Sequence, residues 1–149
     1  MIEYTVKVWP NGTKSWYLNG KRHREGGPAI ERANGTKEWH LNGKLHREGG
    51  PAYEDSDGTK SWYLNGQRHR EGGPAIERAI GTKSWWLNGE LHREGGPAVE
   101  WADGSKEWYL NGKELTEEEH RQQTQPQPTC EGKTVEIDGK TYVLILKES

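Results

Sequence analysis

Arginine, histidine and tryptophan recur in this chain at one spacing of 23 residues, and these are the side chains that could do chemistry. Arginine can hold a phosphate or a carboxylate, histidine can bind a metal or transfer a proton, and tryptophan offers a flat ring for stacking. The three columns are Arg24, Arg47, Arg70 and Arg93; His23, His46, His69 and His92; and Trp16, Trp39, Trp62, Trp85 and Trp108.

These columns lack the features of an active site. No nucleophile accompanies a base, no glycine-rich loop has the pattern of a phosphate cradle, and no acid pair lies outside the period. Neighbouring histidines in a sheet lie two strands, about 9–10 Å, apart, whereas zinc–histidine bonds are only about 2.1 Å long. Cys130 is the only cysteine, so no Cys pair supplements them. We therefore expect no enzymatic activity, no cofactor and no metal site.

The columns belong to a repeat that runs from Thr13 to Ala33 and returns with one change from Thr59 to Ala79. A fixed period of about 20 to 50 residues marks a repeat architecture. Each copy has Asn-Gly after its Trp segment, the pair favoured by two-residue hairpins with a type I′ turn, and usually a second Asn-Gly or Asp-Gly before it. We predict an all-β fold, an elongated antiparallel meander of repeated β-hairpins.

The Asn19-Gly20 turn predicts which side chains share a face, because side chains alternate along a strand. The second strand of the hairpin is interrupted by Gly26-Gly27-Pro28, where we expect a kink. The expected pairs on one face are Leu18–Lys21, Trp16–His23 and Lys14–Glu25, and those on the other face are Tyr17–Arg22 and Ser15–Arg24.

Four segments follow from these patterns. Residues 1–112 form the repeat array, a half-repeat and then five Trp hairpins. Residues 113–123 form a capping helix, in which Thr116 and Glu119 make a capping box. Residues 124–132 are a polar linker, and residues 133–147 are a C-terminal β-hairpin turning at Asp138-Gly139. Two strands alone are marginal in water, so this hairpin should dock on the array, on another copy or on a partner.

Composition narrows the class of protein. The formal charge is −2, which argues against a nucleic-acid binder, since those usually carry a basic face. Aliphatic residues are few, and eight Trp and six Tyr replace them as packing residues. The start has no secretory signal, no apolar run could span a membrane, and one cysteine fits a reducing compartment. We expect a cytoplasmic protein without a membrane role.

Function must then come from side chains that packing leaves available. The Trp and His columns are interpreted as structural, and the arginines either as a ladder satisfied by glutamates or as an anion-binding stripe. Aromatic residues together with arginine are the usual anchors of interfaces. The candidate binding residues are Tyr17, Arg22, Arg24, His40, Arg47, Tyr63, Arg68, Arg70, Trp86, Arg93 and Tyr109.

The unit Trp-Tyr-Leu-Asn-Gly-Lys-Arg-His-Arg-Glu-Gly-Gly resembles the MORN repeat family over residues 11 to 112. The variant with Trp-Tyr-x-Asn-Gly, His-Arg and Gly-Gly-Pro-Ala is similar to repeats in bacteriophage, bacterial and large DNA virus proteins. Arg24 and its equivalents stand where the family usually has glycine. The resemblance implies scaffolding, self-association and, in some members, phospholipid binding.

We expect a non-catalytic module that engages a partner protein, as a phage-encoded accessory or anti-defence factor in the host cytoplasm. Two alternatives stay open. One is a sponge that sequesters a small anionic ligand such as a nucleotide signal. The other is a self-assembling, homo-oligomeric or virion-associated structural protein.

Overall fold

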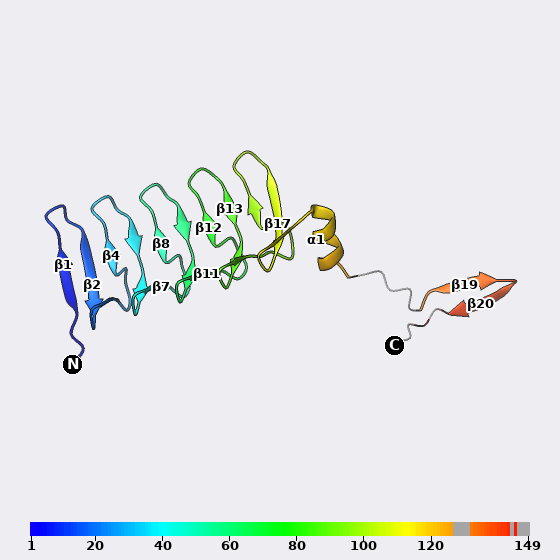
Figure 1. Ribbon diagram of the computed structural model, residues 1–149, viewed down its shortest axis with the longest axis horizontal. Coiled ribbons are helices and arrows are strands. Elements are labelled where there is room, and N and C mark those ends of the chain that lie inside the picture. The colour runs from blue at the N-terminus through cyan, green and yellow to red at the C-terminus, as the bar shows by residue number, and fades with distance from the viewer. Residues whose placement is uncertain (127–131, 144, 146–149) are drawn as a thin grey trace.

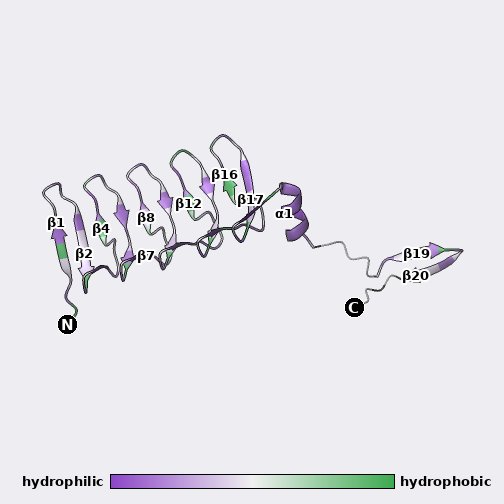
Figure 2. Cartoon of the chain, in the orientation of Figure 1, coloured by the Kyte–Doolittle hydropathy of each residue, from purple (hydrophilic) through white to green (hydrophobic). Residues whose placement is uncertain are grey.

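The computed structural model describes residues 1–126, 132–143 and 145, and shows a row of hairpins followed by one helix and a further hairpin (Figure 1). The predicted all-β meander of repeated hairpins is confirmed. Hydrophilic residues predominate along the array, and apolar residues form only short segments, as at Val99, the first residue of β16 (Val99–Glu100) (Figure 2).

A 12-stranded antiparallel sheet runs the length of the array. Each repeat adds two neighbouring strands to it, so no connection crosses over another. In spatial order its strands are β1 (Thr5–Val8), β2 (Lys14–Leu18), β4 (Ile30–Glu31), β5 (Lys37–Glu38), β8 (Tyr53–Glu54), β9 (Lys60–Ser61), β12 (Ile76–Glu77), β13 (Lys83–Ser84), β16, β17 (Lys106–Leu110) and β18 (Lys113–Leu115), with β3 (Lys21–Arg22) paired to β2.

Small hairpins form the other edge of the middle repeats. They are β6 (His40–Leu41) with β7 (Lys44–Leu45), β10 (Tyr63–Leu64) with β11 (Gln67–Arg68), and β14 (Trp86–Leu87) with β15 (Glu90–Leu91). Both central residues of the Asn-Gly turn that follows each Trp segment have positive φ, as in Asn65 at 50° and Gly66 at 83°. This is the geometry that a type I′ turn requires, so the predicted turn is confirmed.

The predicted strand pairing is correct only near each turn. Leu18 lies opposite Lys21 and Tyr17 opposite Arg22, and the His23 N–H donates to the Trp16 carbonyl at 3.1 Å. The pairs Lys14–Glu25 and Ser15–Arg24 are wrong, because Lys14 pairs with Glu31 and Ser15 with Ile30. The chain leaves the sheet after His23 and re-enters at Ala29, where its carbonyl accepts the Trp16 N–H at 2.8 Å. The glycines and proline therefore form an excursion rather than a simple kink.

The core is a narrow strip where the excursion returns to the sheet. In each of the first four repeats, one fully buried alanine is followed by a branched aliphatic residue or Tyr53. The side chains next to this strip in neighbouring strands are small or polar, as in buried Ser15, Ser61 and Ser84. The four alanines, each 0% exposed, are Ala29, Ala52, Ala75 and Ala98.

Consecutive repeats are joined by backbone hydrogen bonds at the hairpin edge as well as in the main sheet. The Arg24 N–H donates to the His40 carbonyl at 3.1 Å, and the Gly43 N–H donates to the Arg22 carbonyl at 2.8 Å. The same two bonds recur in the following repeats, for example from Arg47 to Tyr63. Both edges of the array are therefore held at the spacing of two strands per repeat.

Helix α1 (Glu117–Thr124) closes the array, and its Thr116–Glu119 capping box is confirmed. The helix begins later than the predicted segment 113–123, because Lys113–Leu115 is strand β18 and pairs with β17. The last hairpin therefore still forms, although its sequence departs from the repeat after Gly112. No helix among the described residues is long and apolar enough to cross a membrane.

The C-terminal hairpin consists of β19 (Thr134–Ile137) and β20 (Lys140–Val143), and its turn at Asp138 has the predicted positive φ of 51°. Every described side chain of both strands is exposed. Residues 144 and 146–147 of the predicted hairpin and residues 127–131 of the predicted linker lie outside the described residues.

Candidate functional site: a row of grooves between repeats

Each arginine that follows a repeat histidine lies over the tryptophan of its own repeat. The distances from guanidinium carbon to ring centroid are 3.9 Å for Arg24 on Trp16, 4.0 Å for Arg47 on Trp39, and 3.8 Å for both Arg70 on Trp62 and Arg93 on Trp85. Such contacts are cation–π interactions, which strengthen when the pair is shielded from water. We call these four pairs the arginine stacks.

Hydrogen bonds fix each guanidinium in place on its ring. Nη1 of Arg70 donates to the Pro74 carbonyl at 2.9 Å and to Glu77 Oε1 at 2.8 Å. The other three arginines make the same pair of bonds, with Glu31, Glu54 and Glu100 as the carboxylates. Each stacked arginine is thus paired with the glutamate seven residues downstream, which agrees with the interpretation of the arginines as a ladder satisfied by glutamates.

The second glycine of each excursion leaves the room that the guanidinium needs. A Cβ built on Gly50 would lie 3.0 Å from the Arg47 guanidinium carbon, and one on Gly73 would lie 3.0 Å from that of Arg70. The first glycine has a different role, since Gly49 has a φ of 75° and no neighbour within 4 Å of such a Cβ. The Gly-Gly pair therefore serves both the turn and the stack.

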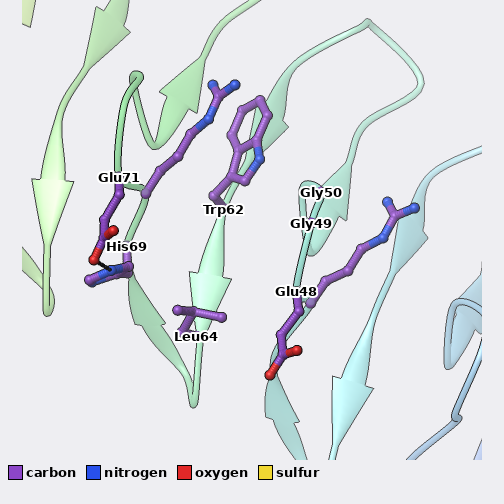
Figure 3. Close-up of a pocket in the computed structure, with 9 residues that line it drawn as sticks. Glu48, Gly49, Gly50, Trp62, Leu64, His69 and Glu71 are labelled. Carbon is purple, nitrogen blue, oxygen red and sulfur yellow. Dashed lines mark ion pairs between the residues drawn. The ribbon is translucent and has the colours of Figure 1, made fainter.

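A groove opens between each pair of consecutive repeats. The central groove has a volume of about 510 Å³, and its neighbours measure about 450 and 470 Å³. In the central groove, Trp62 lies between the segment of His69 and Glu71 and the Gly49-Gly50 excursion of the preceding repeat, with Leu64 below (Figure 3). The equivalent tryptophans of the flanking grooves are Trp39 and Trp85. One wall is thus aromatic and the other is glycine backbone.

The repeat histidines link one repeat to the next. Nδ1 of His46 accepts the Asn65 backbone N–H at 3.0 Å, and Nδ1 of His69 accepts that of Asn88 at 3.0 Å. Because Nδ1 is an acceptor, the ring proton of a neutral imidazole is on Nε2, which faces a glutamate. The structural interpretation of the histidine column is supported by these bonds.

A row of exposed carboxylates runs along the mouths of the grooves. Glu48 and Glu71 flank the central groove, and their side chains are 89% and 88% exposed. In the described part of the chain their ion-pair contact is a histidine Nε2, at 4.0 and 3.8 Å. The glutamate row consists of Glu25, Glu48, Glu71 and Glu94.

The hollows at the two ends of the row are lined in part by residues from outside the repeats, and these residues differ between the two ends. At the first repeat, Tyr4 and Val6 border a smaller hollow beside Trp16 and Glu25. At the last repeat, helix α1 supplies His120 and Arg121 beside Trp108 and Glu94, and His120 Nε2 donates to the Arg93 carbonyl at 2.6 Å. The helix therefore restores a His-Arg pair to the one repeat whose hairpin lacks it.

The predicted candidate residues do not form one surface. Arg24, Arg47, Arg70 and Arg93 lie on the face of the tryptophans, which we call the groove face, because the excursion swings each arginine onto its ring. The prediction that they share a face with the Tyr17 column is wrong. That column, with Arg22 and Arg68 opposite two of its members, remains on the other side of the hairpins: Tyr17, His40, Tyr63, Trp86 and Tyr109.

The aromatic column on that other side bonds largely to its own sheet. Trp86 Nε1 donates to Ser84 Oγ at 2.8 Å, and the Tyr109 hydroxyl donates to Glu107 Oε2 at 3.4 Å. Arg68 reaches two rings, donating to the Tyr63 hydroxyl at 3.2 Å and lying 4.9 Å from the Trp86 centroid. In the first repeat, Lys7 Nζ lies 5.0 Å from the Tyr17 centroid, and Arg22 is exposed.

His40 is the exception in that column, because it is buried and bonds to a carboxylate. His40 Nε2 donates to Glu38 Oε2 at 3.0 Å, and Arg32 Nη2 donates to Glu38 Oε1 at 2.5 Å. These contacts, with the histidine bond the largest, lower the pKa of Glu38 to about 2 against the ordinary value of 4.5. The cluster is a local structural feature of one repeat, since the other copies have serine or Glu107 at this position.

Two sets of groove residues were not singled out by sequence reasoning. From the sequence, Glu25 is expected only to lie opposite Lys14, and the second glycine only to kink the strand. Both sets recur with the 23-residue period, and this recurrence is the sequence feature from which they could have been identified. His120 and Arg121 could not be assigned to the last groove from the sequence. They lie outside the 23-residue period, and a helix places them there instead of a hairpin.

Each groove combines an aromatic ring, glycine backbone and exposed carboxylates, groups that can bind a ligand. Among residues 1–126, 132–143 and 145, no three His, Cys, Asp or Glu side chains are grouped so as to hold a metal ion. No model of a known protein family matches the chain, and a comparison with curated proteins finds no match. The function must therefore be argued from the grooves themselves.

Proposed function

We propose that this chain is a non-catalytic binding module that engages an extended segment of a partner protein along its groove face. The observation that carries this proposal is the row of three nearly equal grooves, each with a fixed Trp wall, a glycine wall and a pair of exposed glutamates. Stacked and hydrogen-bonded walls need little ordering when a ligand arrives, which favours affinity.

The repetition of the site favours an extended ligand over a compact one. Repeat arrays present continuous surfaces whose contacts add from one repeat to the next. Occupying three linked grooves turns the second and third contacts into intramolecular events, so modest individual contacts suffice. The groove residues are nearly the same in each copy, which suits a partner segment that is itself repetitive.

We further propose that the repeats are MORN-like, of the variant found in phage, bacterial and large DNA virus proteins. Under this proposal the partner is a host protein, and the chain acts in the host cytoplasm as a phage-encoded accessory or anti-defence factor. The Arg that replaces the family's usual glycine builds the stack, and so distinguishes this groove from that of other members.

A sponge for a small anion is less well supported by the grooves. Each stacked guanidinium already donates to a carboxylate at 2.8–3.2 Å. An incoming phosphate would compete with that glutamate and would meet the glutamate row at the mouth. Self-assembly is also less well supported. The hairpin β19–β20 is exposed, but nothing about it points to a second copy of the chain as its partner.

Face-resolved photo-crosslinking tests the proposed function. A photoreactive amino acid replaces Leu64 in the central groove or, as a control, Arg22 on the other side of the hairpins. The chain is expressed in its own cellular background, and adducts are identified by mass spectrometry, together with small molecules that co-purify. We expect one protein to be captured from Leu64 and not from Arg22.

Two results contradict this proposal. Capture from Arg22 alone places the partner on the other face. A nucleotide retained at about one per chain, and lost on Arg47→Ala with Arg70→Ala, supports the sponge instead.

A further inference from the structure

We propose that the grooves take a polyproline-II segment, with an apolar residue seated in each groove and a basic residue over each member of the glutamate row. The inference rests on the proposed function, because it names the class of partner segment that the groove face would bind. The spacing of the grooves, their lining and their charge all favour such a segment.

The spacing of the grooves is set by the sheet. Two antiparallel strands span about 9.4–9.8 Å, and each repeat contributes two strands. The bonds from Arg24 to His40 and from Gly43 to Arg22 hold the hairpin edge at this spacing too. A ligand that repeats along the array must therefore present equivalent side chains about every 9.6 Å.

Polyproline II matches this spacing better than the other regular structures. It has three residues per turn and a rise of about 3.1 Å, so equivalent side chains recur about every 9.3 Å. A β-strand repeats on one side about every 6.7 Å. A helix with heptads repeats about every 10.5 Å and drifts by about 2 Å over the two intervals between three grooves, whereas polyproline II drifts by about 0.6 Å.

The lining of the grooves also suits such a segment. Proline-rich segments dock in aromatic-lined grooves, and their preformed conformation loses little entropy on binding. Here one wall is the ring of Trp62 with Leu64 beneath it, and the opposite wall is the Gly49-Gly50 backbone. A flat apolar ring such as that of proline can pack between them.

The charge of the grooves determines which other side chains the partner segment must carry. Arg47 and Arg70 are bonded to Glu54 and Glu77, and the lysines of the main sheet stand in register with those same glutamates. The glutamate row, in contrast, is exposed and contacts only histidine among the ion pairs of the described residues. A basic side chain beside each seated residue would complement this row.

The chain itself brings a basic side chain into one hollow of the row. Helix α1 places Arg121 in the fourth groove, where it lines the same hollow as Trp108 and Glu94 while its guanidinium pairs with Glu118 of the same helix. Arg121 is not part of a repeat and comes from a helix, so this hollow has room for an arginine supplied from outside the hairpins. A partner would supply the equivalent residue at the three open grooves.

The test is a titration of the full chain with fluorescent peptides. The probe is four copies of Pro-Pro-Arg, and three comparison peptides change one property each. Four copies of Pro-Pro-Glu reverse the charge, four copies of Gly-Ser-Arg remove the polyproline-II preference, and an arginine heptad helix changes the period. We expect measurable binding of Pro-Pro-Arg, weakened by salt, and binding about tenfold or more weaker for each comparison peptide.

Protein variants locate the site. Glu48→Lys with Glu71→Lys should abolish binding of Pro-Pro-Arg. The control Glu114→Lys with Glu136→Lys makes the same change in net charge at exposed positions outside the grooves and should leave binding within about twofold. Circular dichroism of each variant shows that the array is folded.

Equal binding of Pro-Pro-Glu, tighter binding of the heptad helix, or unchanged binding by the groove double variant would overturn this inference. So would absence of binding to Pro-Pro-Arg. These failures are separable from failure of the proposed function, because a partner captured from Leu64 without any polyproline-II binding contradicts the segment class alone.

Discussion

Arg70 lies 3.8 Å over Trp62, and the same guanidinium donates to the Pro74 carbonyl and the Glu77 carboxylate. This relationship ties the excursion, the hairpin and the main sheet of a repeat together through one side chain. It also fixes the ring that forms the wall of the central groove. Stability and the shape of the groove therefore depend on the same residue.

Replacing Arg70 should destabilise the array even when the charge is kept. Arg70→Lys retains a cation but loses the planar stack and the fixed geometry of the two hydrogen bonds. We expect a loss of about 1–3 kcal/mol in the free energy of unfolding for Arg70→Ala, and most of that loss for Arg70→Lys. Denaturant unfolding measures both.

The exposed Arg22 is the control for this prediction. Arg22→Ala should change the free energy of unfolding by less than about 0.5 kcal/mol. Equal stability of Arg70→Ala and Arg22→Ala would show that the stack contributes nothing.

Neighbouring glycines offer a matched pair for the groove wall. A Cβ on Gly96 would lie 3.1 Å from the Arg93 guanidinium carbon, whereas one on Gly95 meets nothing within 4 Å. Gly96→Ala should displace Arg93 from Trp85, lower the melting temperature and change the tryptophan fluorescence. Gly95→Ala should change none of the three measurably, and the reverse order of effects would contradict the proposed role of the second glycine.

Acid should weaken the second repeat through Glu38. Its pKa is lowered to about 2 by His40 and then Arg32, whereas in the unfolded chain it is near 4.5. A lowered pKa means that this stabilisation is complete above about pH 5 and is lost as the pH falls from 4.5 to 2. The contribution at neutral pH is on the order of 3 kcal/mol.

Unfolding measured between pH 2 and pH 7 checks this dependence. Glu38→Gln should flatten the acid limb of the stability curve, while Glu107→Gln at the equivalent position of the last repeat should leave it in place. An acid limb unchanged by Glu38→Gln would assign the pH dependence to other groups.

The repeat histidines should share one tautomer. Nδ1 of His46, His69 and His92 each accepts a backbone N–H at 3.0 Å. Long-range nitrogen–proton correlation spectra at neutral pH should therefore show the proton on Nε2 in all three rings. A signal from the Nδ1–H tautomer in these rings would contradict the link between repeats.

Sequence reasoning was most successful where the constraint is local. The Asn65-Gly66 turn and the Thr116–Glu119 box follow from backbone preferences of a few residues, and both are confirmed. The expectation fails from Arg24 onward, because it continues the period-two alternation into a segment that leaves the sheet after His23. That error placed Arg24 opposite Ser15, when the returning chain brings Ile30 there and the excursion brings Arg24 onto Trp16.

Indole spectra provide the most direct test of the groove face, because tryptophans mark both sides of the array. Trp39, Trp62 and Trp85 line the open grooves, whereas Trp86 lies on the other side and Trp101 bonds to Glu107 away from them. Titrating the nitrogen-15-labelled chain with four copies of Pro-Pro-Arg, or with a captured partner, should shift the Nε1–H resonances of Trp39, Trp62 and Trp85 and leave those of Trp86 and Trp101 in place. Shifts of Trp86 with the three groove indoles unmoved would contradict binding along the groove face.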